Sequence, residues 1–204
     1  MQSGLDHLFN QLLRPRLRPI LSDVYRDVTY ILDEDAYADA EYRDDVRKRF
    51  IRSWETLLSG YRVRSSDADD LKLLTSLRPQ ESFTPTNYNL FFATAVSFLV
   101  RPWEGMIRGM KFTEVRASFV PYCSLLTPSS QLGALRLDRD LRSILSYLCT
   151  QSSFASGSIR ESFSRLQQIA TLLTLDNPEE AEEVLSATGN WLTQGEIKTI
   201  WAMR

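Results

Sequence analysis

The chain has 204 residues, of which 43% are hydrophobic and 25% are charged, an ordinary composition for a globular protein with a substantial core. Its 24 basic and 26 acidic residues give a net charge of −2, which excludes the basic excess expected of a nucleic-acid-binding protein. Two cysteines, Cys123 and Cys149, are too few for a disulfide scaffold and fit a reducing compartment.

Helical periodicity runs through the N-terminal half of the sequence. Pro15 and Pro19 predict that a first helix, from about residue 5, stops or kinks there. A second helix is expected over residues 20–32, where apolar residues recur at helical spacing. An acidic connection follows over residues 33–45. The next amphipathic helix carries an apolar stripe formed by Val46, Phe50, Trp54, Leu57, Leu58 and Tyr61.

The longest apolar stretch, residues 90–100, predicts a buried helix that starts at Thr84 and Pro85, a cap followed by the residue favoured at the first helical position. This stretch is shorter than the roughly 17–25 residues of a membrane-spanning helix. The N-terminus also lacks the pattern of a signal peptide. We therefore expect any association with a membrane to be peripheral or to depend on a partner.

The C-terminal third carries clear helix-start signals. Ser158 and Glu161 form one capping-box pattern, and Thr193 and Glu196 form another that opens the last helix. An apolar stripe over residues 137–148 predicts a further helix before them. Alternation of the kind found in strands is sustained nowhere, so the predicted fold class is all-α.

The sequence contains no pattern typical of a catalytic or metal-binding site. His7 is the one histidine, so a histidine-based metal cluster cannot form. A Ser-His-Asp or Cys-His site would have to use His7, whose expected role is ordinary packing or surface exposure, and glycine-rich phosphate loops are missing. Asp33 and Asp35 begin like a calcium loop, but Ala38 stands where glycine is needed for the turn. A second acidic group, at residues 67–70, is better explained as a solvated segment. We therefore expect no enzyme activity, no cofactor and no metal ion.

Four segments resemble the C-terminal part of subunit 4 of the conserved oligomeric Golgi complex, a vesicle-tethering assembly. They are residues 13–20 (LRPRLRPI), the acidic residues near 33–42, residues 132–150 (LGALRLDRDLRSILSYLCT) and residues 159–176 (IRESFSRLQQIATLLTLD). The last two are the most specific, because they combine a Leu-Gly turn, an alternating Asp/Arg helix start and a second helix that ends in a leucine-rich run. The resemblance implies an elongated helical bundle of the kind found in large tethering complexes.

The resemblance also implies a non-enzymatic role in retrograde transport within the Golgi apparatus, as a peripheral protein on the cytosolic face of the Golgi membrane. The implied partners are the other subunits of the complex, SNARE proteins and their regulators, and small GTPases. Three alternatives remain open. The same periodicity fits a helical adaptor or regulatory module unrelated to tethering, and a hydrolase or transferase could assemble its residues from distant positions. The chain could also be the product of a mistaken gene model that does not fold.

Two segments depart from the family pattern, residues 63–80 and residues 115–131. Each begins with Val-Arg and ends with Gln, which codons at the two ends of an intron can encode. Both are therefore either translated introns or surface loops, and loop entropy does not decide between these. We expect a helical bundle over residues 1–131 and a small C-terminal helical unit over residues 132–204. Because Met1 leads directly into what resembles mid-protein sequence, we expect the chain to be a fragment of a longer subunit.

Arg165 is the charged residue most expected to hold the C-terminal unit together. It falls on the same helical side as Ile169 and Leu172, close to the apolar stripe. A partly buried arginine needs a carboxylate partner. We expect this partner to be Glu196, whose other expected role is the capping box with Thr193.

Two further charged groups are expected on the surface. Asp138, Arg139, Asp140 and Arg142 are predicted to be helix-surface charges, with Asp138 and Arg142 paired across one turn. The arginines in residues 14–18 are predicted to lie in a solvated connector, although they could also contact anionic lipid or a partner.

Overall fold

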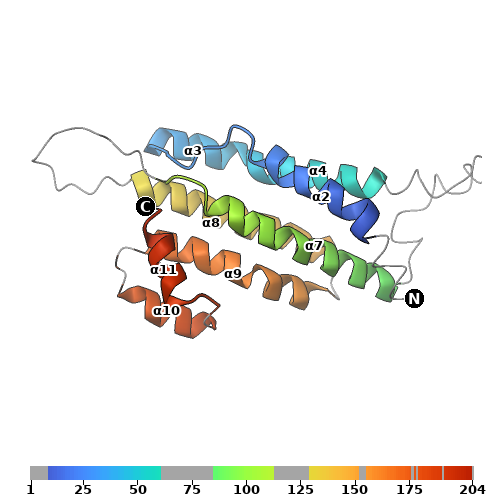
Figure 1. Ribbon diagram of the computed structural model, residues 1–204. Helices are drawn as coiled ribbons and strands as arrows, with labels where there is room; N and C mark the ends of the chain where they lie inside the picture. Colours follow the sequence, from blue (N-terminus) through green and yellow to red (C-terminus); the bar gives the residue numbers. More distant parts are fainter. Residues whose placement is uncertain are drawn as a thin grey trace, which may run out of the picture. The chain divides into compact units, whose positions relative to one another are not determined.

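The computed structural model describes residues 9–60, 85–112, 129–151, 155–175, 177, 179–189 and 191–203. Within these ranges every regular element is a helix, which confirms the predicted all-α class (Figure 1). In chain order the helices are the π-helix η1 (Phe9–Leu13) and the α-helices α2 (Arg14–Val24), α3 (Glu34–Arg43), α4 (Asp45–Gly60), α7 (Pro85–Ile107), α8 (Ser129–Gln151), α9 (Ser156–Thr174), α10 (Glu180–Thr188) and α11 (Gln194–Trp201).

Several predictions concern residues outside these ranges. His7, Cys123, the acidic residues 67–70 and the suspected insert at 63–80 all lie outside the described residues. The second suspected insert does so as well, apart from residues 129–131, which belong to the first turn of α8. The predictions made for these residues stay predictions.

The chain forms two compact units, each built from three segments. Unit 1 consists of Met1–Arg26, Val46–Trp103 and Ile144–Ser162, and unit 2 consists of Asp27–Asp45, Glu104–Ser143 and Phe163–Arg204. Helices α7, α8 and α9 therefore contribute residues to both units. Each unit draws on segments from before and after residue 131, and the division into residues 1–131 and 132–204 stays a prediction.

Aromatic side chains from α4 and α7 fill the core of unit 1. Phe50 stacks on Trp54 and on Trp103, with ring centroids 5.8 and 5.7 Å apart, and Trp54 meets Phe92 edge to face. The indole N–H of Trp103 donates a hydrogen bond of 2.8 Å to the hydroxyl of Tyr25. A buried aromatic cluster of this kind is stabilising beyond the area that it buries. The apolar stripe predicted for α4 is confirmed at Val46, Phe50, Trp54 and Leu57, which are buried, whereas Leu58 is only partly buried and Tyr61 lies outside the described residues.

Helix α7 is longer than its sequence suggested. Within the described ranges it is the one helix that passes the length and composition test for a membrane span, over Asn89–Ile107. The apolar stretch at residues 90–100 is itself shorter than a membrane span, as expected, but the helix continues past it through Arg101 and Pro102 to Ile107. Its apolar face is nevertheless occupied, since Phe92, Val96, Leu99 and Trp103 are fully buried. These contacts are those of a core helix.

The prolines near the N-terminus do not stop the helix. The chain passes from π-helical to α-helical winding at Arg14, and α2 contains both Pro15 and Pro19. Proline is tolerated in the first turn of an α-helix, and Pro15 is the second residue of α2. The arginines at 14–18 thus belong to a helix and not to a connector. The helix predicted over residues 20–32 ends at Val24, after which the chain turns through residues 25–27.

The acidic segment after residue 33 is a helix, which corrects the predicted connection. Asp33 caps α3, since its side chain accepts a hydrogen bond of 2.8 Å from the backbone N–H of Ala36. The acidic residues of the first turn face the positive end of the helix dipole, and Arg43 lies in the last turn. Arg43 also pairs with Asp39 one turn earlier. The charges that suggested a solvated segment therefore favour a helix at their positions.

The start of α9 differs from its prediction. The helix begins at Ser156, so Ser158 lies inside its first turn and is not the cap. The backbone N–H of Ile159 already bonds to the carbonyl of Ala155. The predicted apolar stripe of this helix is confirmed, because Phe163, Leu166, Ile169 and Leu173 are fully buried.

Candidate functional site

The most connected charged group in unit 2 centres on Arg165 of α9. Its guanidinium makes two parallel hydrogen bonds to Glu104 of α7, from Nε to Oε2 at 2.8 Å and from Nη2 to Oε1 at 3.1 Å. Nη2 also donates to Oε1 of Glu196, and Nη1 donates to the backbone carbonyl of Trp191 at 2.6 Å. A two-pronged arginine–carboxylate pair is geometrically specific and stronger than a neutral hydrogen bond. Glu104 and Glu196 hold the pKa of Arg165 above its ordinary value.

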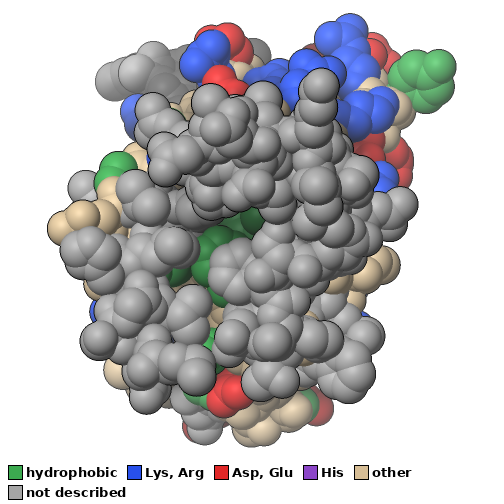
Figure 2. Space-filling view, turned by 90° about the vertical axis from the view of Figure 1, so that its right-hand side faces the viewer, with side chains coloured by type: hydrophobic (Ala, Val, Ile, Leu, Met, Phe, Trp, Pro, Cys, Tyr) green, Lys and Arg blue, Asp and Glu red, His purple; other side chains and the backbone are tan. Residues whose placement is uncertain are grey.

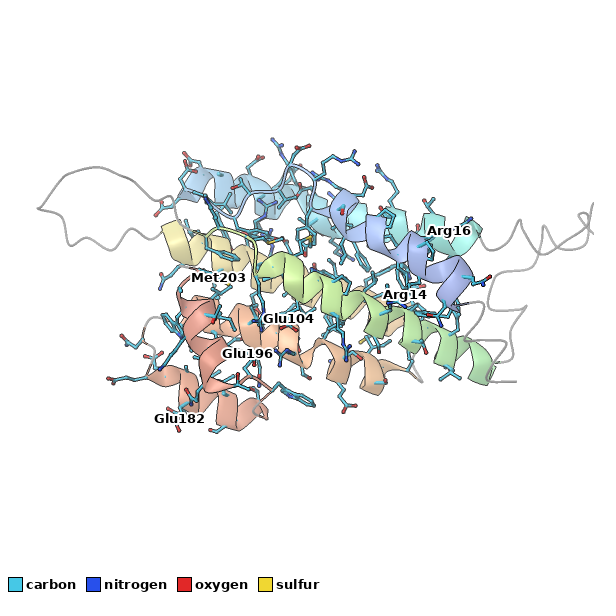
Figure 3. All side chains as sticks on the ribbon, in the orientation of Figure 1. Arg14, Arg16, Glu104, Glu182, Glu196 and Met203 are labelled. Atoms are coloured by element: carbon cyan, nitrogen blue, oxygen red, sulfur yellow. The ribbon has the colours of Figure 1, made fainter. Side chains whose placement is uncertain are left out.

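A second arginine completes the group. Arg108, in the turn that follows α7, donates from Nη2 to Oε1 of Glu104 at 2.7 Å and to Oε1 of Glu196 at 3.0 Å. Figure 3 shows Glu104 on α7 and Glu196 on α11 next to each other, as two shared arginine partners require. We call Glu104, Arg108, Arg165 and Glu196 the ion-pair cluster. It has no net charge and joins α7, α9 and α11.

The two carboxylate oxygens of Glu196 make different sets of contacts. Its Oε2 accepts hydrogen bonds from the backbone N–H and the hydroxyl of Thr193 at 2.9 and 2.8 Å, while its Oε1 faces Arg165 and Arg108. The predicted capping box at the start of α11 is thereby confirmed. The backbone N–H of Thr193, then its hydroxyl, then the two arginines lower the pKa of Glu196 to about 2.

The cluster contains both residues chosen from the sequence and two that were missed. The structure places Arg165 and Glu196 in direct contact. Their contribution to stability stays a prediction. Glu104 and Arg108 were missed, although a signal was present: Glu104 is a carboxylate at the end of a long apolar run, four residues before an arginine.

A buried glutamine extends the contacts of α9. Gln168 lies one turn after Arg165 and is almost fully buried. Its Nε2 donates to the hydroxyl of Thr188 at 2.9 Å and to the carbonyl of Gly189 at 3.3 Å, and its Oε1 accepts from the N–H of Trp191 at 3.2 Å. Figure 1 shows α10 and α11 beside this part of α9. Arg165 and Gln168 together fix the segment that connects these two short helices.

A second polar network in unit 2 surrounds Asp140 of α8. The hydroxyl of Tyr30 donates to its Oδ2 at 3.1 Å, and Arg136 and Arg139 lie 3.7 Å from its two oxygens. Burial raises the pKa of Asp140 to about 6, against the lowering influence of Arg136 and Arg139. The prediction of a surface charge is therefore wrong for Asp140, which only packing from another segment could bury.

The two arginines of this network tie α8 to the segment around α3. Arg136 donates to the carbonyl of Thr29 and to Oδ1 of Asp45, each at 3.0 Å. Arg139 donates to the carbonyl of Ala40 at 3.1 Å. The predicted pair of Asp138 and Arg142 is confirmed at 2.8 Å. Arg142 is exposed as predicted, whereas Asp138 and Arg139 are half-buried.

Gly133 lies inside α8 and not in the turn predicted for it. A Cβ atom at this position would stand 1.8 Å from the carbonyl oxygen of Tyr30. Glycine is thus required because the backbone before α3 approaches α8 too closely for any side chain. The sequence predicted that this glycine forms a turn, whereas the structure shows that it allows two backbone segments to pack closely.

The ion-pair cluster suits a structural role, in which the charged groups stay bound to one another. A group that moves protons at neutral pH needs a pKa near 7, whereas the pKa of Glu196 is lowered to about 2. Both carboxylates are bound by arginines. In the part of the chain that the structure describes, no three His, Cys, Asp or Glu side chains are grouped so as to hold a metal ion.

The family match covers nearly the whole chain. Residues 1–199 match the family model described as "Conserved oligomeric Golgi complex subunit 4, C-terminal". The chain belongs to this family. Its all-α fold and its resemblance to that subunit were both expected from the sequence, and both are confirmed.

Curated relatives carry the same name. The subunit 4 of Arabidopsis thaliana is 28% identical over 211 residues, which cover 100% of this chain and 23% of that protein. The subunit 4 of Homo sapiens is 24% identical over 211 residues, covering 100% of this chain and 22% of that protein. The chain thus spans less than a quarter of the length of these relatives. No solved structure matches the chain.

Proposed function

We propose that this chain is the C-terminal part of a non-enzymatic subunit of a Golgi vesicle-tethering complex and acts in retrograde transport within the Golgi through protein–protein contacts. The observation that carries the proposal is the family match over residues 1–199. The same match favours a tethering subunit over an unrelated helical adaptor. The fully paired ion-pair cluster supports a role that needs a rigid helical body and no reacting group.

The implied partners are the other subunits of the complex, with SNARE proteins, their regulators and small GTPases as further candidates. The implied location is the cytosolic face of the Golgi membrane, with peripheral attachment. The exposed faces of the helices would serve as docking surfaces, while the ion-pair cluster would keep α11 in place at the C-terminal end of the chain.

Affinity purification tests the proposal. The tagged chain is expressed in its native organism, and the proteins that purify with it are identified by mass spectrometry. A second bait lacks residues 63–80 and 115–131, and the tag alone serves as control. Recovery of sibling tethering subunits with either bait would support the proposal. A well-folded bait that recovers none of them would overturn it for this part of the subunit and favour the adaptor.

A further inference from the structure

The longest stretch of the chain without a basic residue surrounds α10. Residues 166–197 contain six Asp and Glu residues and neither lysine nor arginine. The residues that border this stretch do not balance it, because Arg165 belongs to the ion-pair cluster, which has no net charge, and Lys198 adds a single positive charge. The surface formed by this stretch is therefore acidic at neutral pH. Charge of one sign is not general in the molecule, since Figure 2 shows acidic side chains next to basic ones along the upper edge of the view.

Three carboxylates of this stretch share the exposed side of α10. The helix buries Ala181 and Leu185. Glu179, Glu182 and Glu183 lie on the opposite side, and all three are exposed. None of the three forms an ion pair with another residue in the part of the chain that the structure describes. Figure 3 shows Glu182 on the side of α10 that faces away from α9. A partner can therefore reach these carboxylates without displacing an ion pair of the fold.

An exposed tryptophan lies at the C-terminal end of the same helix. Trp191 is 44% exposed, yet its backbone is held from both sides, since its carbonyl accepts from Arg165 at 2.6 Å and its N–H donates to Gln168 at 3.2 Å. The indole nitrogen stands 3.5 Å from the place that a Cβ of Gly189, the C-cap of α10, would occupy. Gly189 follows Glu182 by seven residues, which places the two on the same side of the helix. The indole ring and the carboxylates therefore belong to one surface.

The chemistry of this surface fits a protein segment that carries arginine. A guanidinium group stacks on an indole ring and also makes two parallel hydrogen bonds to a carboxylate. Tryptophan is among the residues that supply most of the binding energy in protein interfaces. An anionic bilayer or a nucleic acid would be repelled by the same carboxylates. We propose that Trp191, with the carboxylates Glu179, Glu182 and Glu183, binds an arginine-bearing segment of a partner protein.

This inference deepens the proposed function, since it gives the proposed tethering subunit one docking surface and names the chemistry of the partner. The identity of the protein that supplies the basic segment in the cell rests on that proposed function. The contact itself does not, because it concerns the purified chain and a peptide. Added salt should weaken the binding, because exposed charges are screened beyond a Debye length of about 8 Å at physiological ionic strength.

A titration followed by nuclear magnetic resonance tests the proposal. The purified 204-residue chain is mixed with a capped peptide in which arginine and alanine alternate, and the indole N–H signals of its tryptophans are followed. The signal of Trp191 is expected to move, whereas the signals of the fully buried Trp54 and Trp103 should stay in place. A peptide with glutamine in place of arginine should leave the Trp191 signal unmoved. The double variant Glu182→Gln, Glu183→Gln is expected to bind the arginine peptide at least about threefold more weakly.

Two further variants separate this surface from net charge. Glu34→Gln, Asp35→Asn makes the same charge change at two exposed positions of α3 and should leave binding at Trp191 as in the wild type. Trp191→Ala should lower the affinity for a dye-labelled arginine peptide at least about threefold. Its fold should be kept, which circular dichroism checks, because Arg165 and Gln168 bond to backbone atoms of Trp191.

The possible results of the titration lead to different conclusions. A Trp191 signal that the arginine peptide does not move would overturn the proposal, as would equal losses of affinity in the α10 and α3 variants. A Trp191 signal that moves with the concentration of the chain alone would replace the basic partner by a second copy of this chain. Failure to recover sibling subunits in the affinity purification would overturn the proposed function alone.

Discussion

The side chain of Arg165 makes four hydrogen bonds, and its replacement by alanine is expected to lower the free energy of unfolding. The change removes both hydrogen bonds to Glu104, the contact with Glu196 and the bond to the carbonyl of Trp191. Breaking one partner of a buried pair typically costs about 3–5 kcal/mol, whereas an exposed pair contributes about 0–1 kcal/mol.

The loss expected for Arg165→Ala lies between the values for a buried and an exposed ion pair. The side chains of Glu104, Glu196 and Arg165 are 15%, 25% and 32% exposed, so water screens them in part. Arg108 would also stay within 2.7 and 3.0 Å of the two carboxylates and compensate some of their charge. We therefore expect a loss of about 2–3 kcal/mol. For a chain of this size, that corresponds to a fall in Tm of roughly 4–12 °C.

Unfolding in urea and on heating, followed by circular dichroism, measures this loss. Arg142→Ala is the matched control, because Arg142 pairs with a single carboxylate across one turn and is 66% exposed. It should change stability by no more than about 0.5 kcal/mol. Arg165→Lys should fall between the two, since an ammonium group cannot make the two-pronged contact. If Arg165→Ala loses no more stability than Arg142→Ala, the argument for the cluster is wrong.

Three other changes test the remaining contacts of unit 2 and the last helix, and one experiment tests the sequence. Gly133→Ala forces a Cβ against the carbonyl of Tyr30 and should cost about 2–4 kcal/mol in urea unfolding, whereas Gly157→Ala, which meets open space, should be neutral or slightly stabilising. Asp140→Asn tests the raised pKa of Asp140. The fold favours the neutral carboxyl group, so the stability that Asp140 contributes to the wild type is fully present below about pH 4 and is lost as the pH rises through about 6. A pH series of Tm should show this loss, on the order of 3 kcal/mol, in the wild type and not in the variant. Thr193→Ala should cost about 1 kcal/mol through the lost cap, again by urea unfolding. Reads of spliced mRNA should skip both suspected inserts; reads that run through them would establish genuine loops.

Local sequence determined the helices and the faces that they bury. The stripe Val46, Phe50, Trp54 repeats at helical spacing, and this side of α4 is the one that is buried. Thr193 and Glu196 stand three residues apart, which is enough for a capping box because both hydrogen bonds stay within one turn. The acidic segment shows where composition misleads, since the same carboxylates that suit a solvated loop also suit the first turn of α3.

Other features were decided only by the tertiary structure. Gly133 and Tyr30 are far apart in the chain. The sequence around each residue does not indicate that the two backbone segments are in close contact. The burial of Asp140 likewise depends on that distant segment. The sequence alone established that the chain is helical, belongs with a tethering subunit and carries Arg165 near an apolar stripe. The inclusion of Glu104 and Arg108 in its cluster came from packing. Periodicity reports which side of a helix is buried, but the partner on that side is chosen by segments far away in the chain.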